Sequence, residues 1–188
     1  SQEKAYKTFR GLWRAGFNIS NLGPRMKYEE LGRKNFIPTN FKIGSAFDFI
    51  FDTSNKVSLN LELNKLLVPS PSIPIKNSNG QIIGYNQSDV SFLSGIFKSF
   101  GDAPNGFSEE LEEITVSFGL EYLYNNSFAI RAGYFNENEN KGARKYFTVG
   151  TGFKIEEINL DLSYLLSTSS VISPLENTLR FSFTYNFL

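Results

Sequence analysis

The sequence predicts an all-β fold, an antiparallel transmembrane β-barrel. Residues 179–187 alternate strictly between large apolar or aromatic side chains at odd positions and polar side chains at even positions, as in a β-strand with one apolar face. Other stretches with this alternation run for about nine to twelve residues, which suits a tilted membrane crossing. The connections between them alternate between short and long, as in outer-membrane barrels with short periplasmic turns and long outer loops.

The last strand carries the clearest signal. In a barrel its odd positions face lipid and its even positions face a polar lumen. An aromatic stripe of this kind is typical of the closing strand of an outer-membrane barrel, where it serves as the assembly signal. Its residues are Leu179, Phe181, Phe183, Tyr185 and Phe187. The last strand of a soluble sandwich or lipocalin-like barrel would show the same pattern, and the alternation of loop lengths favours the membrane barrel.

The amino-acid composition excludes several classes of function. The 188 residues suffice for one domain, and 19 Lys and Arg balance 19 Asp and Glu, so the net charge gives no reason to expect nucleic acid as a partner. The chain has neither Cys nor His, which removes disulfides, thiol chemistry and Ser-His-Asp or Cys-His catalysis. We therefore expect no catalytic residues, no metal and no cofactor.

The strands follow from alternation and from turn chemistry. Gly23 permits positive φ and Pro24 ends strand pairing, while Asn125 and Asn126 suit a two-residue hairpin. The nine predicted strands cover residues 9–19, about 25–29, 40–51, 56–64, 111–124, 127–135, 144–155, 158–166 and 179–187. Their connections are short at 20–24, 52–55, 125–126 and 156–157, and longer at 30–38, 66–109, 136–142 and 167–174.

The connection at 66–109 is a long extracellular loop insertion that carries a short helix. Pro69, Pro71 and Pro74 preclude a regular central strand. From Ser88 onward the apolar period becomes helical, with Ser88 or Asp89 as the cap and Gly101 as the stop. The apolar face of this helix comprises Phe92, Leu93, Ile96, Phe97 and Phe100. This face could dock on a partner or pack onto the barrel mouth as a plug.

The alternation of the loops also gives the direction of each strand. The last strand runs from an outer loop to the periplasm, and by the same count the strand at 9–19 also runs inward. Bacterial barrels have an even number of strands, so nine strands do not close one. We therefore expect residues 1–188, which begin at Ser1 rather than Met, to be the C-terminal part of a single larger barrel domain.

Charged residues recur on the predicted lumen side of the strands. They are Lys42, Asp48, Glu62, Glu121, Arg131, Asp161 and Arg180. Because both signs are present, a lattice of salt bridges is the simplest interpretation. The four carboxylates are weak evidence for an enzyme. Acidic runs at 109–113 and 137–139 could bind Ca²⁺ through oxygen ligands, but we interpret them as solvated loop ends.

Five stretches of the chain resemble a known family. They are residues 18–25, 36–40 and 61–69, and, most specifically, 94–104 and 141–147. From about residue 11 onward the chain resembles the PorV family of outer-membrane barrels of the type IX secretion system, within the wider FadL-like family. The resemblance implies a barrel of about 14 strands, of which this chain would supply the last nine. One departure is Leu188, which follows the expected terminal aromatic residue Phe187.

The resemblance also implies a function and a location. A PorV-like protein would be a non-enzymatic, multi-pass protein of the bacterial outer membrane, in contact with outer-membrane lipid. It would collect secreted cargo at a very large SprA-type translocon barrel by recognising folded C-terminal signal domains. It would then shuttle the cargo to the proteins of a surface attachment complex.

A second hypothesis is a transporter of hydrophobic solutes, as other FadL-like barrels are. Such a protein needs an apolar pocket that leads to an opening in the barrel wall. The inward positions of these strands are polar, so they show no apolar conduit. Detergent or fatty acid inside the barrel would favour this alternative.

Overall fold

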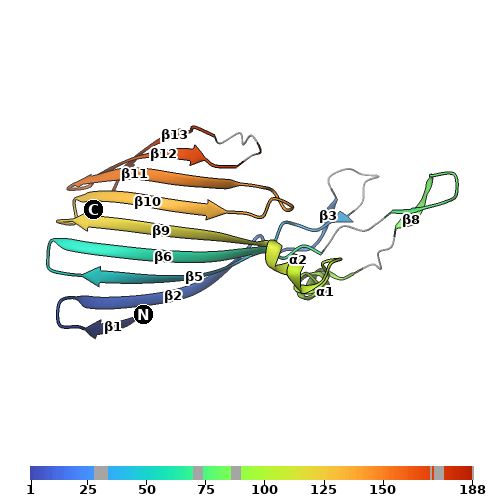
Figure 1. Ribbon diagram of the computed structural model, residues 1–188, viewed down its shortest axis with the longest axis horizontal. Helices are drawn as coiled ribbons and strands as arrows, with labels where there is room; N and C mark the ends of the chain where they lie inside the picture. The colour runs from blue at the N-terminus through green and yellow to red at the C-terminus, as the bar shows by residue number, and fades with distance from the viewer. Residues whose placement is uncertain (28–33, 70–73, 86–89, 170, 172–175, 188) are drawn as a thin grey trace. The chain divides into compact units, whose positions relative to one another are not determined.

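The computed structural model describes residues 1–27, 34–69, 74–85, 90–169, 171 and 176–187. It confirms the all-β prediction, because one large sheet of nine strands dominates the chain (Figure 1). The chain divides into two compact units. The first comprises Ser1–Phe17, Lys42–Asn64 and Ile114–Leu188, and the second comprises Asn18–Phe41 and Lys65–Glu113.

The strands of the large sheet pair in the order β1-β2-β5-β6-β9-β10-β11-β12-β13, with β1 and β13 at its two edges. The pairs β1–β2, β9–β10, β10–β11, β11–β12 and β12–β13 are antiparallel. The strands are β1 (Gln2–Ala5), β2 (Arg10–Ser20), β5 (Asn40–Ile50), β6 (Asn55–Leu66), β9 (Ile114–Tyr124), β10 (Phe128–Asn136), β11 (Lys145–Ile155), β12 (Ile158–Ser167) and β13 (Leu179–Tyr185).

The remaining elements belong to the second unit. Two small hairpins pair β3 (Met26–Lys27) with β4 (Lys34–Asn35), and β7 (Pro74–Lys76) with β8 (Ile82–Tyr85). The helices are α1 (Phe92–Lys98) and α2 (Phe107–Glu112). In the described part of the chain, no helix has the length and apolar character that a membrane crossing requires.

The register gives the sheet an apolar face and a polar face. On the apolar face Tyr122 pairs with Ile130, and Leu160 pairs with both Phe153 and Phe183. On the polar face the cross-strand pairs are Glu121 with Arg131, Gly152 with Asp161, and Asp161 with Ser182. The alternation in the sequence therefore predicted the two faces of these strands correctly.

Two predictions about the first strands are wrong. Residues 1–8 were assigned no element, yet Gln2–Ala5 form β1 and pair with β2. Met26–Lys27 form the short strand β3, which pairs with β4 outside the large sheet, and residues 28 and 29 lie outside the described residues. The count of nine strands survives because β1 replaces the strand predicted near 25–29. The direction predicted for the strand at 9–19 is reversed, because β2 follows a short turn and precedes a long connection.

The corrected connections still alternate in length. They are short at 6–9, 51–54, 125–127 and 156–157, and longer at 21–39, 67–113, 137–144 and 168–178. The short turns lie together at one end of the sheet, on the left in Figure 1. Backbone hydrogen bonds join neighbouring turns there, from Asn125 N to Ser54 O at 2.7 Å and from Asn186 N to Glu157 O at 2.9 Å. The two ends of the sheet are therefore different, as expected of a barrel with a turn side and a loop side.

Candidate functional site

The two longest connections fold together in the second unit. The backbone N–H of Leu67 donates to Thr39 O at 2.7 Å, and the Thr39 hydroxyl donates to Asn21 O at 3.0 Å. Thr39 itself is fully buried. The Arg25 guanidinium lies 5.0 Å from the centre of the Phe36 ring. Segments that are far apart in the sequence thus share one small core.

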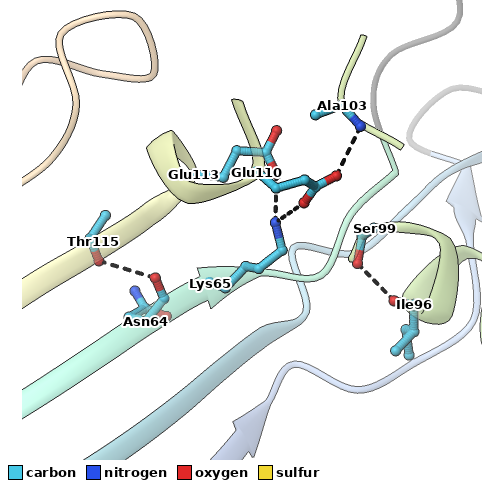
Figure 2. Close-up of polar contacts among 8 residues, drawn as sticks. All are labelled: Asn64, Lys65, Ile96, Ser99, Ala103, Glu110, Glu113 and Thr115. Atoms are coloured by element: carbon cyan, nitrogen blue, oxygen red, sulfur yellow. Dashed lines mark hydrogen bonds and ion pairs between the residues drawn. The ribbon is translucent and has the colours of Figure 1, made fainter. Parts of the chain in front are cut away.

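Helix α1 packs closely against this core. A Cβ atom on Gly95 would collide with the Phe36 ring and crowd Pro69, so a glycine is needed where the helix meets both segments. The Ser91 hydroxyl caps the helix by accepting from Ser94 N at 3.3 Å. The buried Ser99 hydroxyl donates to Ile96 O at 2.7 Å (Figure 2). The cap is therefore Ser91, whereas the predicted caps Ser88 and Asp89 lie outside the described residues.

The structure divides the predicted apolar face of α1 into two groups. Phe92 and Ile96 are half-buried. Leu93, Phe97 and Phe100 are 61%, 75% and 52% exposed. One side of the helix therefore packs, while large apolar side chains on the other side remain accessible.

Helix α2 was not predicted and adds to the exposed apolar surface. It begins after Gly106, which has φ 74°, and it presents Phe107 and Leu111 at 77% and 52% exposure. The sequence did contain a signal, because Phe107 and Leu111 are four residues apart and acidic residues follow the helix breakers Pro104 and Gly106. The predicted strand at 111–124 therefore begins later, at Ile114. We call Leu93, Phe97, Phe100, Phe107 and Leu111 the loop surface.

A buried ion cluster anchors α2 to the end of β6 (Figure 2). Lys65 Nζ lies 2.8 Å from Glu110 Oε2 and 2.7 Å from Glu113 Oε2, and the backbone N–H of Ala103 donates to Glu110 Oε1 at 2.9 Å. The side chains of Lys65 and Glu110 are only 8% and 7% exposed. The prediction that residues 109–113 are a solvated loop end is therefore wrong for Glu110.

Electrostatics keep Glu110 ionised in this buried position. Burial alone would raise its pKa, because desolvation disfavours the charged carboxylate. The hydrogen bonds from Lys65 and Ala103, with the attraction of the ammonium group, outweigh burial and hold the pKa of Glu110 below its ordinary value. The cluster is therefore charged at neutral pH.

The loop between β10 and β11 contains another ion pair with a buried carboxylate, between Arg144 and Glu137. Glu137 is 8% exposed and accepts two hydrogen bonds from Arg144, at 2.6 and 3.0 Å. The Arg144 guanidinium also lies 5.5 Å from the centre of the Phe135 ring. Residues 137–139 were interpreted as solvated, which is wrong for Glu137. Among the described residues, no three acidic side chains come together in a way that could hold a metal ion.

The predicted lumen charges form ion pairs on the polar face of the first unit. Lys42 Nζ lies 2.9 Å from Glu62 Oε1. The Arg14 guanidinium donates to both oxygens of Asp48, at 2.7 and 2.8 Å, and Asp48 is 3% exposed. Arg14 was not among the predicted lumen charges, and its partner Asp48 lies 34 residues away, so no local pattern indicates the pair. A carboxylate with a fixed cation partner is a poor candidate for acid-base catalysis.

Arg131 connects three strands of this face. It donates to Glu121 on β9 at 2.7 Å and to Asp161 on β12. It reaches β12 across β11 because Gly152 lies between them, where a Cβ atom would collide with both the Arg131 and the Asp161 side chains. Arg180, on the edge strand β13, is exposed and makes no ion pair with the residues that the structure describes.

Two hollows along the strands are lined by both polar and apolar side chains. One, of about 510 Å³, is lined by residues that include Arg14, Asn60, Leu61, Glu62 and Phe118. Another, of about 490 Å³, is lined by residues that include Glu121, Leu123, Arg131, Phe153 and Asp161.

The predicted assembly stripe lies along the edge strand β13. Its five residues are between 49% and 89% exposed. The strand ends at Tyr185, and the Tyr185 and Phe187 rings contact each other with centroids 4.8 Å apart. The backbone of Asn186 still bonds to the adjacent turn at Glu157, so the chain remains attached to the sheet beyond the strand.

An apolar face, an ion-paired polar face and loops that alternate in length are features of the outer-membrane β-barrel class of proteins. A family model described as type IX secretion system protein PorV matches residues 1–73. Over these residues the chain has the sequence of the PorV family, so the resemblance is confirmed. The matching family is a component of the type IX secretion system and of the outer membrane, which agrees with the role and location that the resemblance implies. A search among curated proteins found no match.

Proposed function

We propose that the protein binds secreted cargo at the translocon of the type IX secretion system and passes it to the surface attachment complex. The translocon would be a SprA-type barrel, and the cargo would be recognised by its C-terminal signal domains. In this proposal the loop surface makes the contact with the secretion machinery. The polar face of the strands stabilises the barrel and takes no part in chemistry.

The exposure of the loop surface is the observation that supports this proposal. Five large apolar side chains, four on two short helices and Phe100 just after the first, are each at least 52% exposed. Single exposed apolar residues are common, but such a group within one small unit marks an interaction site. Close packing of Gly95 against Phe36 and Pro69 holds α1, and the buried contacts of Glu110 hold α2. A fixed apolar surface loses little conformational entropy when a partner covers it.

The proposal is tested by replacing Phe97 and Phe100 with Asp in the native full-length protein. The protein is purified in mild detergent, and co-purifying proteins are identified by mass spectrometry. The wild type is expected to bring a very large barrel and secreted proteins that share a C-terminal domain. Phe97→Asp with Phe100→Asp is expected to lose them while the barrel still assembles, as judged by heat-modifiable mobility on gels.

Ser94→Asp provides the control, since it adds one negative charge at an exposed position of α1 without removing an apolar side chain of the loop surface. It is expected to retain all partners. Unchanged co-purification with the double Asp variant would contradict the docking role. A monomer that carries lipid or fatty acid would instead support a FadL-like transporter with the helix as a plug.

A further inference from the structure

We infer that Lys65 is a positioning residue for the loop surface, acting through the buried Glu110 and the partly buried Glu113. This inference rests on the proposed docking role of that surface. Phe107 and Leu111 belong to α2, the helix that carries Glu110. It would act by fixing the helix that presents them.

The geometry of the cluster supports this role. Glu110 accepts from Lys65 through Oε2 and from the Ala103 backbone through Oε1, so its carboxylate links three chain segments. These segments are the end of β6, the connection that follows α1, and α2 itself. Helix α2 spans only Phe107–Glu112, which is too short to be stable without tertiary contacts.

Burial makes the cluster sensitive to the loss of one partner. The three side chains of the cluster are between 7% and 20% exposed. Removing the cation would leave the buried carboxylate of Glu110 without its cation partner, which is far more costly than losing an exposed pair. The simplest relief is for α2 to detach and become hydrated. Phe107 and Leu111 would then no longer occupy fixed positions.

The test replaces Lys65 with Met, which keeps the length of the side chain and removes its charge. In the full-length protein in mild detergent, protease cleavage between residues 100 and 113 is expected to accelerate by about a hundredfold, because a buried pair is broken. Co-purification of the translocon barrel and cargo is expected to fall by at least about tenfold on the same reasoning. Heat-modifiable mobility should show that the barrel still assembles.

Lys145→Met is the matched control. Lys145 also pairs with a glutamate at 2.8 Å, but this glutamate, Glu139, is 68% exposed. Its loss is expected to change neither cleavage nor co-purification. Lys65→Arg restores a cation and should recover both. If Lys65→Met does not assemble, Glu110→Gln serves instead, because it keeps an acceptor for Ala103 N–H and weakens the cluster.

The outcomes separate this inference from the proposed function. If the Phe97 and Phe100 variant loses its partners while Lys65→Met keeps them, the positioning role of Lys65 is wrong and the docking surface stands. If the phenylalanine variant keeps its partners, the proposed function is itself wrong. Equal losses for Lys65→Met and Lys145→Met would also overturn the inference, because burial would then have no effect.

Discussion

At the scale of single residues, burial decides which charges matter. The pair Arg10–Glu3 is more than half exposed on both sides, and such pairs contribute little to stability. The cluster around Lys65 is almost fully buried, and its members depend on one another. The same reasoning applies on the apolar face, where Trp13 Nε1 donates to Ser45 Oγ at 2.8 Å. The indole N–H and the serine hydroxyl satisfy each other's hydrogen-bonding capacity, which lipid could not do.

The lowered pKa of Glu110 predicts that acid loosens α2. Because the pKa in the folded protein lies below the ordinary value of 4.5, the stabilisation is complete above that value. It is lost as the pH falls through the lower pKa of the folded form. A nitroxide on Ser108→Cys in α2 is therefore expected to stay immobile from neutral pH down to the ordinary value and to become mobile below it.

The control for this titration is Glu110→Gln, which has no carboxyl group to protonate at that position. Its nitroxide mobility is expected to change much less over the same pH range. A label on Asn126→Cys, in a short turn of the first unit, should show no transition. If α2 loosened well above the ordinary pKa, or if Glu110→Gln titrated as the parent does, Glu110 would not be the responsible group.

For single residues, the sequence indicated which charged side chains lie on the polar face but not which residues they pair with. Lys42 and Glu62 were assigned to the same face from alternation alone, and they form a pair. Arg14 and Asp48 are 34 residues apart, and Lys65 and Glu110 are 45 apart, so neither pair follows from a local pattern. The run at 109–113 appears solvated in the sequence because nothing nearby indicates a buried lysine.

At the scale of elements, turn chemistry gives a sharp prediction for the β9–β10 hairpin. Asn125 and Asn126 have φ of 49° and 52°, and Ser127 N donates to Tyr124 O at 3.0 Å. Asn126→Val should destabilise the folded protein by about 1–2 kcal/mol, because a β-branched residue is strained at positive φ. Asn126→Gly should stay within a few tenths of a kcal/mol, roughly, of the parent. Urea unfolding in lipid vesicles measures both, and equal effects would contradict the turn assignment.

Elements with strict alternation were predictable, and elements without it were not. Residues 40–51 and 56–64 alternate on both sides of a compact turn, and the structure has strands at Asn40–Ile50 and Asn55–Leu66. Strand β1 reads QEKA, with no apolar face, and its position comes from its pairing with β2. Strand β3 has only two residues, Met26 and Lys27, and it pairs locally with β4. In both cases the strand depends on its pairing partner and not on an alternating pattern of its own.

At the scale of the whole molecule, correcting one strand changes the predicted orientation of its neighbours. With β1 included, residues 6–9 join the short turns and residues 21–39 join the long connections. Because short turns lie on the periplasmic side of outer-membrane barrels, residue 22 is now expected outside the cell and residue 8 inside. The original count placed residues 20–24 in a periplasmic turn, so the two assignments differ in a measurable way.

Cysteine labelling on intact cells distinguishes them, because the chain has no cysteine of its own. A membrane-impermeant maleimide is expected to label Leu22→Cys, Phe97→Cys and Asn140→Cys directly. It should label Thr8→Cys, Asn126→Cys and Glu156→Cys only after the outer membrane is permeabilised. Labelling of Asn126→Cys on intact cells would show that the barrel has the opposite orientation in the membrane. Protection of Leu22→Cys together with labelling of Thr8→Cys on intact cells, with the other four sites as expected, would instead restore the original count and remove β1 from the barrel wall.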